Sequence, residues 1–241
     1  MNTVNINEKN INNLISLFSL MGVDKTRNNL KFSKSWPNKL WFDYDYSQKD
    51  LINAIQEAST ASRTFSIPLW NKDVLYDEYI ELFEKNKMKI SFEQIGMSLD
   101  LKAQRSFESR DADIRIINKD EDISAWVELA SASFSYSINP EIIKEVARSP
   151  KATFLLAYKN NDPVGTALLY EDANVLGIHL VGVPKEHRGH GLAYNIMLEA
   201  INIAKTKEIN FLTLQASVLG LGIYKRLGFK EDFIMKNYIK E

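Results

Sequence analysis

The residues best suited to chemistry lie in one run near the three-quarter point of the chain, VGVPKEHRGHGLA at residues 181–193. Gly189 and Gly191 lack a Cβ, so the backbone there can take positive φ and approach a ligand closely. The first N–H groups of the helix expected from Leu192 have no intrahelical partner and lie at the positive end of the helix dipole. Together with the charge of Arg188, these features predict a binding site for an anion such as a diphosphate.

Two common phosphate-binding loops do not fit this run. A dinucleotide fingerprint Gly-x-Gly-x-x-Gly needs a third glycine three places after Gly191, where Tyr194 stands. A Walker loop needs Gly-Lys-Ser or Gly-Lys-Thr, which is also absent. An isolated Gly-x-Gly is more often a tight turn than a ligand site. The loop alone therefore predicts phosphate binding without choosing the cofactor.

The run resembles the signature of the GNAT superfamily of N-acetyltransferases, Gln/Arg-x-x-Gly-x-Gly/Ala, usually found within Arg-Gly-x-Gly-Ile/Leu-Gly/Ala. At its first position, Glu186 replaces Gln or Arg. The longer form is matched by Arg188, Gly189, Gly191, Leu192 and Ala193.

This resemblance implies acetyl-CoA as the co-substrate. It implies that backbone N–H groups across residues 188–193, His190 included, hold the pyrophosphate of CoA. It also implies that the backbone of Val181 and Val183 pairs with the pantetheine arm like an added strand.

A second stretch, SVLGLGIYKRLGF at residues 217–229, resembles the family's Asn-x-x-Ala-x-x-Leu-Tyr-x-x-x-Gly-Phe. Tyr224 and the Gly-Phe pair are in register, while Ser217 and Gly220 replace Asn and Ala. Ser217 is accordingly a further cofactor-binding candidate. The two blocks occur in the family's order, which makes a chance match of both unlikely.

Acetyl transfer to an amine needs a neutral nucleophile, a polarised thioester carbonyl and a proton for the departing thiolate. The resemblance assigns the proton to the Tyr224 hydroxyl, a donor at neutral pH, although a tyrosine packed in a helix core is the simpler alternative. Counting back from Arg188, the backbone N–H that polarises the carbonyl falls at His179, where the fourth strand splays from the fifth.

The general base stays open. An imidazole with a pKa of about 6.5 suits the role, so the His179 side chain is a candidate. A histidine on an apolar strand is also often a hydrogen-bonded core residue. Glu171 and Glu186 are weaker candidates.

Other residue types restrict the chemistry further. The chain has no cysteine, which excludes a cysteinyl intermediate and favours direct transfer in a ternary complex. The three histidines lie close together in sequence, but Glu186 is the only carboxylate beside His187 and His190. We therefore expect no metal and interpret these two histidines as solvated loop residues.

The acceptor is expected to be a primary amine of a small molecule or peptide, bound around Phe134, Tyr136 and Ser137, where the family binds its acceptors. Two other classes stay open: a non-catalytic acyl-CoA-binding or sensor protein, and an interaction module with an incidental glycine loop.

Composition limits the partners. The 30 basic and 31 acidic residues of the 241 give a net charge of −1, so neither nucleic acid nor an anionic membrane is the expected partner. No run approaches the ~20 apolar residues of a membrane span, which predicts a cytoplasmic, soluble protein. The sequence allows a monomer or a homodimer.

The elements that must position these residues alternate clearly from Asp113 onward. The predicted order β-α-α-β-β-β-α-β-α-β indicates a layered α/β fold, in which helices flank a mixed, mostly antiparallel sheet. The expected strands span 113–117, 152–158, 164–170, 175–183, 211–216 and 229–239, and the expected helices span 123–134, 139–148, 192–205 and 219–227.

The chain before this region has its own pattern. An amphipathic helix around residues 11–21 precedes strands at 39–43, 63–70 and 89–101 and helices at 50–61 and 73–86. This β-α-β-α-β order echoes residues 175–239, which indicates a degenerate GNAT-like repeat or an unrelated α/β cap. We expect an N-terminal domain at 1–101, a linker at 102–112 and the catalytic domain at 113–241.

Overall fold

The computed structural model describes residues 5–27, 29–71, 75–102 and 112–241. The chain forms two compact units. The first unit consists of Met1–Met97, Gln215–Leu221 and Glu231–Glu241, and the second unit consists of Ser98–Leu214 and Gly222–Lys230. The predicted linker falls largely outside the described residues.

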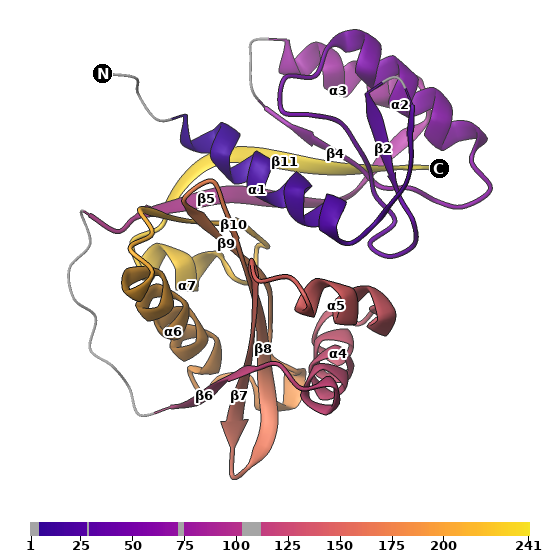
Figure 1. Ribbon diagram of the computed structural model, residues 1–241. Coiled ribbons are helices and arrows are strands. Elements are labelled where there is room, and N and C mark those ends of the chain that lie inside the picture. The colour runs from indigo at the N-terminus through magenta and orange to yellow at the C-terminus, as the bar shows by residue number, and fades with distance from the viewer. Residues whose placement is uncertain (1–4, 28, 72–74, 103–111) are drawn as a thin grey trace. The chain divides into compact units, whose positions relative to one another are not determined.

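The second unit is built on the strand order β6-β7-β8-β9-β10. The neighbours from β6 to β9 are antiparallel, and β9 and β10 are parallel. In Figure 1, α4 and α5 cover one face of this sheet and α6 covers the other. The predicted fold class, a mostly antiparallel mixed sheet flanked by helices, is confirmed.

The elements of the second unit agree closely with the predicted order. The strands are β6 (Asp113–Ile117), β7 (Ala152–Lys159), β8 (Asp162–Asp172), β9 (Val175–Gly182) and β10 (Phe211–Ala216). The helices are α4 (Asp120–Phe134), α5 (Pro140–Ala147), α6 (Leu192–Thr206) and α7 (Leu221–Arg226).

Local sequence explains the two hairpins of this sheet. Asn160 and Asn161 both have positive φ between β7 and β8, and so do Ala173 and Asn174 between β8 and β9. Two-residue turns of this kind match the twist of antiparallel strands, and asparagine tolerates the conformation well. The turns predicted at these places are therefore confirmed.

Trp126 anchors α4 on the sheet. Its side chain is fully buried, and its Nε1–H donates to the Ala167 carbonyl oxygen of β8 at 3.2 Å. The indole also meets the Phe154 ring edge-on, with centroids 5.0 Å apart. Burying a large ring with its one polar group satisfied fixes α4 against β8.

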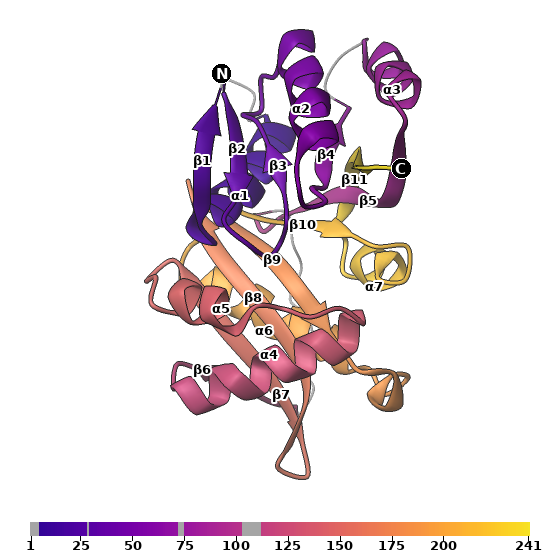
Figure 2. The ribbon, with the colours of Figure 1, turned by 90° about the vertical axis from the view of Figure 1, so that its right-hand side faces the viewer.

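The first unit contains a three-stranded antiparallel sheet, β1-β2-β3, and the strand order β4-β11-β5. Figure 2 shows β1, β2 and β3 side by side. Its strands are β1 (Val23–Arg27), β2 (Leu30–Ser33), β3 (Leu40–Trp41), β4 (Ile67–Trp70), β5 (Met88–Asp100) and β11 (Lys230–Lys240). Its helices are α1 (Ile6–Leu20), α2 (Gln48–Thr60) and α3 (Tyr76–Lys85).

The β1–β2 hairpin was not predicted, because all five residues of β1 are exposed and carry no apolar alternation. The core of this unit is aromatic, with Phe32, Trp41, Phe42, Trp70, Phe83 and Tyr238 fully buried. Within the described ranges, no helix of the chain is long and apolar enough to cross a bilayer.

Candidate functional site

The loop between β9 and α6 combines two left-handed glycines with an open helix start. Gly189 has a φ of 84° and Gly191, the N-cap of α6, has a φ of 76°. A Cβ added at Gly189 would meet no atom within 4 Å. The regular α6 hydrogen bonds begin with Asn195 N–H donating to the Gly191 carbonyl oxygen at 3.0 Å. The glycines thus shape the loop and leave room beside it, as the sequence predicts.

Charge at this helix start favours an anion. Helices α1 to α5 each carry an acidic residue in the first turn, whereas α6 carries none. The loop residues Arg188, Gly189 and His190 are exposed, and Leu192 and Ala193 are partly exposed. The first-turn N–H groups therefore present partial positive charge on an accessible surface, and they fit a diphosphate.

Arg188 supports the loop in a way that the sequence does not show. Its Nε–H donates to the Val183 carbonyl oxygen at 2.8 Å, and an Nη2–H donates to the Ser133 carbonyl oxygen at 3.2 Å. Ser133 lies in the last turn of α4, where backbone carbonyls lack helical partners. Part of the guanidinium thus ties the loop to the ends of β9 and α4, and its remaining N–H groups stay available to an anion.

The backbone of β9 offers an edge beside the loop. Its parallel pairing with β10 runs from Val175 opposite Phe211 to Gly177 opposite Thr213. The pairing covers only these three residues of each strand, although β9 continues to Gly182 and β10 to Ala216. Val181 lies in the part of β9 beyond Gly177 and Val183 directly follows the strand, so their backbones are placed where an extended ligand could pair.

A bulge shapes the same part of β9. The β8–β9 register shifts between Thr166 and Leu168, and Leu180 takes a φ of 51°, which is unusual for leucine. The Thr166 hydroxyl donates to the Leu180 carbonyl oxygen at 3.1 Å. Gly182 is tightly enclosed, since an added Cβ would lie 2.8 Å from the Ser133 Cβ. These residues are not predictable from the sequence, because no local signal marks a leucine for the left-handed region.

His179 precedes the bulge and is 9% exposed. Burial lowers its pKa to about 4, so the imidazole is neutral at neutral pH and is a weak base. Its backbone lies two residues beyond Gly177, the last β9 residue paired with β10. Its role as the carbonyl-polarising amide stays a prediction, and the low pKa leaves the backbone N–H as a better candidate than the side chain.

Tyr224 lies in α7 and is half-buried. Its ring meets Phe229 edge-on at 6.0 Å, and its carbonyl oxygen accepts N–H groups from Leu227 and Phe229 at 3.1 and 3.0 Å. Burial raises the pKa of the hydroxyl to about 12. The group therefore remains a protonated donor through the neutral range, as a proton donor requires.

Comparison with known proteins identifies this architecture. Residues 118–237 match the family model of the acetyltransferase (GNAT) domain. The segment is a GNAT domain. A relative in Bacillus subtilis (strain 168), provisionally named a ribosomal protein bS18-alanine N-acetyltransferase, is 26% identical over 125 residues, which are 49% of this chain and 81% of that protein.

Solved structures extend the likeness beyond this segment. A GCN5-related N-acetyltransferase from Kribbella flavida has a TM-score of 0.71 at 13% identity, covering 99% of this chain and 96% of its own. One from Sphaerobacter thermophilus has a TM-score of 0.65 at 16% identity, covering 88% and 76%. The N-terminal half is therefore also GNAT-like in fold, in agreement with the repeat interpretation.

The remaining predicted residues of the GNAT domain lie in several places. Ser217 is exposed and belongs to the segment of the first unit that precedes α7. Among the acceptor candidates, Phe134 and Tyr136 stack with centroids 5.7 Å apart, and Tyr136 is 46% exposed. Glu171 is paired with Lys207 at 2.8 Å. Glu186 is exposed beside the loop.

Histidine placement bears on metal binding. His179 is buried in β9, whereas His190 is exposed in the loop. Across the described ranges, no group of three or more His, Asp or Glu side chains is arranged to hold a metal ion.

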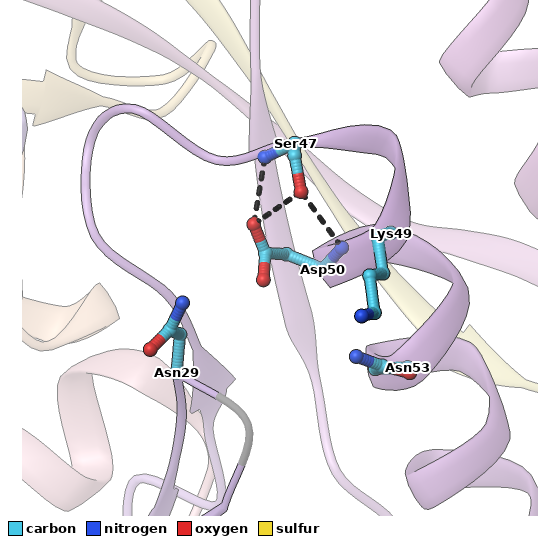
Figure 3. Close-up of a pocket in the computed structure, with 5 residues that line it drawn as sticks. All are labelled: Asn29, Ser47, Lys49, Asp50 and Asn53. Atoms are coloured by element: carbon cyan, nitrogen blue, oxygen red, sulfur yellow. Dashed lines mark hydrogen bonds between the residues drawn. The ribbon is translucent and has the colours of Figure 1, made fainter.

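A hollow of about 410 Å³ lies at the start of α2 in the first unit (Figure 3). The Ser47 N–H donates to Asp50 Oδ2 at 2.8 Å, and the Asp50 N–H donates to Ser47 Oγ at 3.3 Å. This capping box satisfies N–H groups that α6 leaves open, and it places a carboxylate where an anion would bind. At α2, the described residues thus leave no open helix start for an anion, in contrast to α6.

Proposed function

We propose that the protein is an acetyl-CoA-dependent N-acetyltransferase that moves an acetyl group onto a primary amine of a small molecule or peptide. The observation that carries the proposal is the open N-terminus of α6 behind Gly189 and Gly191, with no acidic residue in its first turn. Such a site suits the diphosphate of coenzyme A. The family of residues 118–237 supports the same cofactor.

The residues around the start of α6 contact different parts of acetyl-CoA. Backbone N–H groups of residues 189–193 hold the diphosphate, and the Arg188 side chain keeps the loop in place through Val183 and Ser133. The Arg188 backbone N–H donates to the Lys185 carbonyl oxygen at 3.4 Å. The backbones of Val181 and Val183 pair with the pantetheine arm. This arm then runs along β9 toward the splay.

The chemical step combines an amide and a hydroxyl. The amine nitrogen attacks the thioester carbonyl carbon, whose oxygen accepts a hydrogen bond from the backbone N–H at His179. The C–S bond breaks, the sulfur takes the proton of the Tyr224 hydroxyl, and the amine nitrogen loses a proton to solvent. Solvent then restores the Tyr224 proton. Because the chain has no cysteine, the acetyl group passes directly from thioester to amine.

The acceptor class has one lead. The name of the Bacillus subtilis relative specifies an alanine of ribosomal protein bS18. A peptide that begins with alanine therefore belongs in the acceptor panel beside small primary amines. The half-exposed Tyr136 stacked on Phe134 offers an apolar surface on which an aromatic amine could pack.

The test is an acetylation screen. The protein is incubated with acetyl-CoA and a panel of amines and peptides, and each acceptor is examined for the mass gain of one acetyl group while free CoA is measured. Acetylated product with matching CoA release supports the proposal. No mass gain, together with no heat of CoA binding in calorimetry, contradicts it.

A second candidate is a non-catalytic acyl-CoA-binding protein. The chemical step above has no general base on the protein, because burial lowers the pKa of the candidate His179 imidazole to about 4, and a site without such a base favours this alternative. Under this alternative, acetyl-CoA raises the melting temperature of the protein, but no amine in the panel causes CoA release.

A further inference from the structure

A chain of side-chain hydrogen bonds runs through the first unit and joins all three of its sequence segments. Lys39 Nζ donates to Asn237 Oδ1 at 2.7 Å, and Asn237 Nδ2 donates to Gln94 Oε1 at 3.3 Å. Gln94 Nε2 then donates to the Gln215 backbone carbonyl oxygen at 3.3 Å. Gln215 Nε2 donates to Asn10 Oδ1 at 2.5 Å. We call these five residues the amide chain.

Two backbone carbonyls fix the direction of the amide chain. The carbonyl oxygens of Gln215 and Met97 only accept, so Gln94 and Asn10 must turn their NH₂ groups toward them, Asn10 at 3.1 Å from Met97. The Asn10 oxygen then faces the Gln215 amide nitrogen, and the Gln94 oxygen faces Asn237. Each side-chain amide therefore has one orientation that satisfies its neighbours.

Burial makes this arrangement costly to disturb. Asn10 and Asn237 are both 0% exposed. A buried amide that loses its hydrogen-bond partner is left desolvated without compensation, which costs free energy. Breaking one hydrogen bond of the amide chain is therefore unfavourable. Gln215 is held by two hydrogen bonds: its backbone oxygen accepts from Gln94, and its side chain donates to Asn10.

Gln215 leads directly into the helix that carries Tyr224. It lies at the end of β10, and the next residues form a turn in which the Ser217 carbonyl oxygen accepts N–H groups from Gly220 and Leu221 at 3.0 and 3.2 Å. Leu221 is the first residue of α7. A hydrogen-bonded turn thus connects Gln215 to α7, the helix that contains Tyr224.

We propose that Gln215 is a positioning residue for Tyr224, because the amide chain fixes the start of the segment that carries the tyrosine hydroxyl. The inference rests on the proposed role of Tyr224 as proton donor. Two partners of Gln215 come from the N-terminal half of the chain, because Gln94 donates to its backbone oxygen and Asn10 accepts from its side chain. Asn237 of β11 bonds to Gln94 and orients it.

The test replaces Gln215 by a residue of similar length that cannot donate. Gln215→Met removes the bond to Asn10, and kcat falls about 3- to 30-fold, since small displacements of a catalytic group are costly. The Kd for CoA, measured by calorimetry, stays within about twofold because the diphosphate loop is unchanged. The exposed Gln56→Met is the matched control and leaves both quantities unchanged.

A double variant separates positioning from general loss of structure. If Gln215 acts through the Tyr224 hydroxyl, adding Gln215→Met to Tyr224→Phe lowers kcat no further. Equal fold-losses of kcat in the two backgrounds, or an unchanged kcat in the single variant, overturn the inference. Gln94→Met, which releases the Gln215 backbone oxygen, must give the same pattern and replaces Gln215→Met if that variant fails to fold.

The two proposals fail differently. A wild-type protein that releases no CoA with any amine, or a Tyr224→Phe variant as fast as wild type, overturns the proposed chemistry and the positioning role with it. Wild-type turnover that depends on the Tyr224 hydroxyl but not on Gln215 or Gln94 overturns the positioning role alone.

Discussion

The Thr166 hydroxyl donates to the Leu180 carbonyl oxygen at 3.1 Å, across the bulge that separates the paired part of β9 from the part facing the loop. Thr166 is fully buried, and Leu180 is held at a φ of 51°. A leucine in the left-handed region is strained by about 1–2 kcal/mol. The hydrogen bond from the Thr166 side chain helps to offset this strain.

Thr166→Val should therefore weaken the fold at the bulge. Valine keeps the shape of threonine but not the donor, and it leaves a partly buried carbonyl without this hydrogen bond. The free energy of unfolding, measured by urea denaturation, should therefore fall by about 1–2 kcal/mol. Thr213→Val is the matched control, because this buried hydroxyl finds no partner among the described residues. We expect the control to be neutral or stabilising, and equal losses in the two variants would contradict the role of the bond.

A second prediction concerns the shape of the diphosphate loop. Gly189→Ala places a Cβ at a φ of 84°, in the open space beside the loop where a ligand must approach. The variant loses about 1 kcal/mol of stability through backbone strain, and its affinity for CoA falls about tenfold or more in calorimetry.

The control for this variant is Gly222→Ala. An alanine there also meets nothing within 4 Å, but the residue lies in α7 without a positive φ. It is expected to stabilise the helix by about 0.5–1 kcal/mol and to keep CoA affinity within about twofold. Equal CoA affinities for Gly189→Ala and wild type would remove the diphosphate assignment.

These two sites show what sequence can and cannot predict. Residues 188–193 could be interpreted from residue types alone, because glycine at positive φ and an acid-free helix start are local properties. The left-handed Leu180 could not, since leucine disfavours that conformation and its stabilising partner, Thr166, is distant in sequence. The two hydrogen bonds that hold Gln215 could likewise not be predicted from the sequence, because Asn10 is 205 residues away.

The fold follows the same division. Turns rich in asparagine, such as Asn160–Asn161, predict the hairpin that they form. The ends of strands with buried faces, such as β7, could be predicted from the sequence to within a few residues. The fully exposed β1 had no apolar pattern to reveal it. Whether a histidine on a strand is covered, as His179 is, depends on packing from distant segments and is not encoded locally.

A third prediction addresses the proton donor. Tyr224→Phe removes only the hydroxyl and should lower kcat by about 10²-fold, with the Kd for CoA within about threefold. Because burial raises the pKa of this hydroxyl to about 12, the wild-type rate should not decline from loss of its proton between pH 7 and 10. Rapid-mix measurement of CoA release across this pH range tests both statements, and an unchanged kcat in the variant rejects the donor role.

A fourth prediction separates the backbone of His179 from its side chain. The pKa of His179 in the folded state, about 4, lies below its unfolded value of 6.5. Above pH 6.5 neither state binds the proton, so burying the imidazole does not lower the free energy of unfolding. As the pH falls from 6.5 toward 4, the unfolded state gains a proton that the native state refuses. The free energy of unfolding therefore falls over this window, by at most about 3 kcal/mol.

His179→Gln should flatten this dependence of stability on pH, because glutamine does not titrate, whereas His187→Gln in the loop should keep it. Urea denaturation of the three proteins at pH 7.5 and 4.5 measures the difference. In turnover, His179→Gln keeps the backbone N–H that polarises the carbonyl, so the shape of the kcat profile between pH 6 and 9 should match that of wild type. A fall in kcat toward acidic pH that occurs in wild type and disappears only in this variant would instead show that the imidazole takes the amine proton, which a pKa of about 4 argues against.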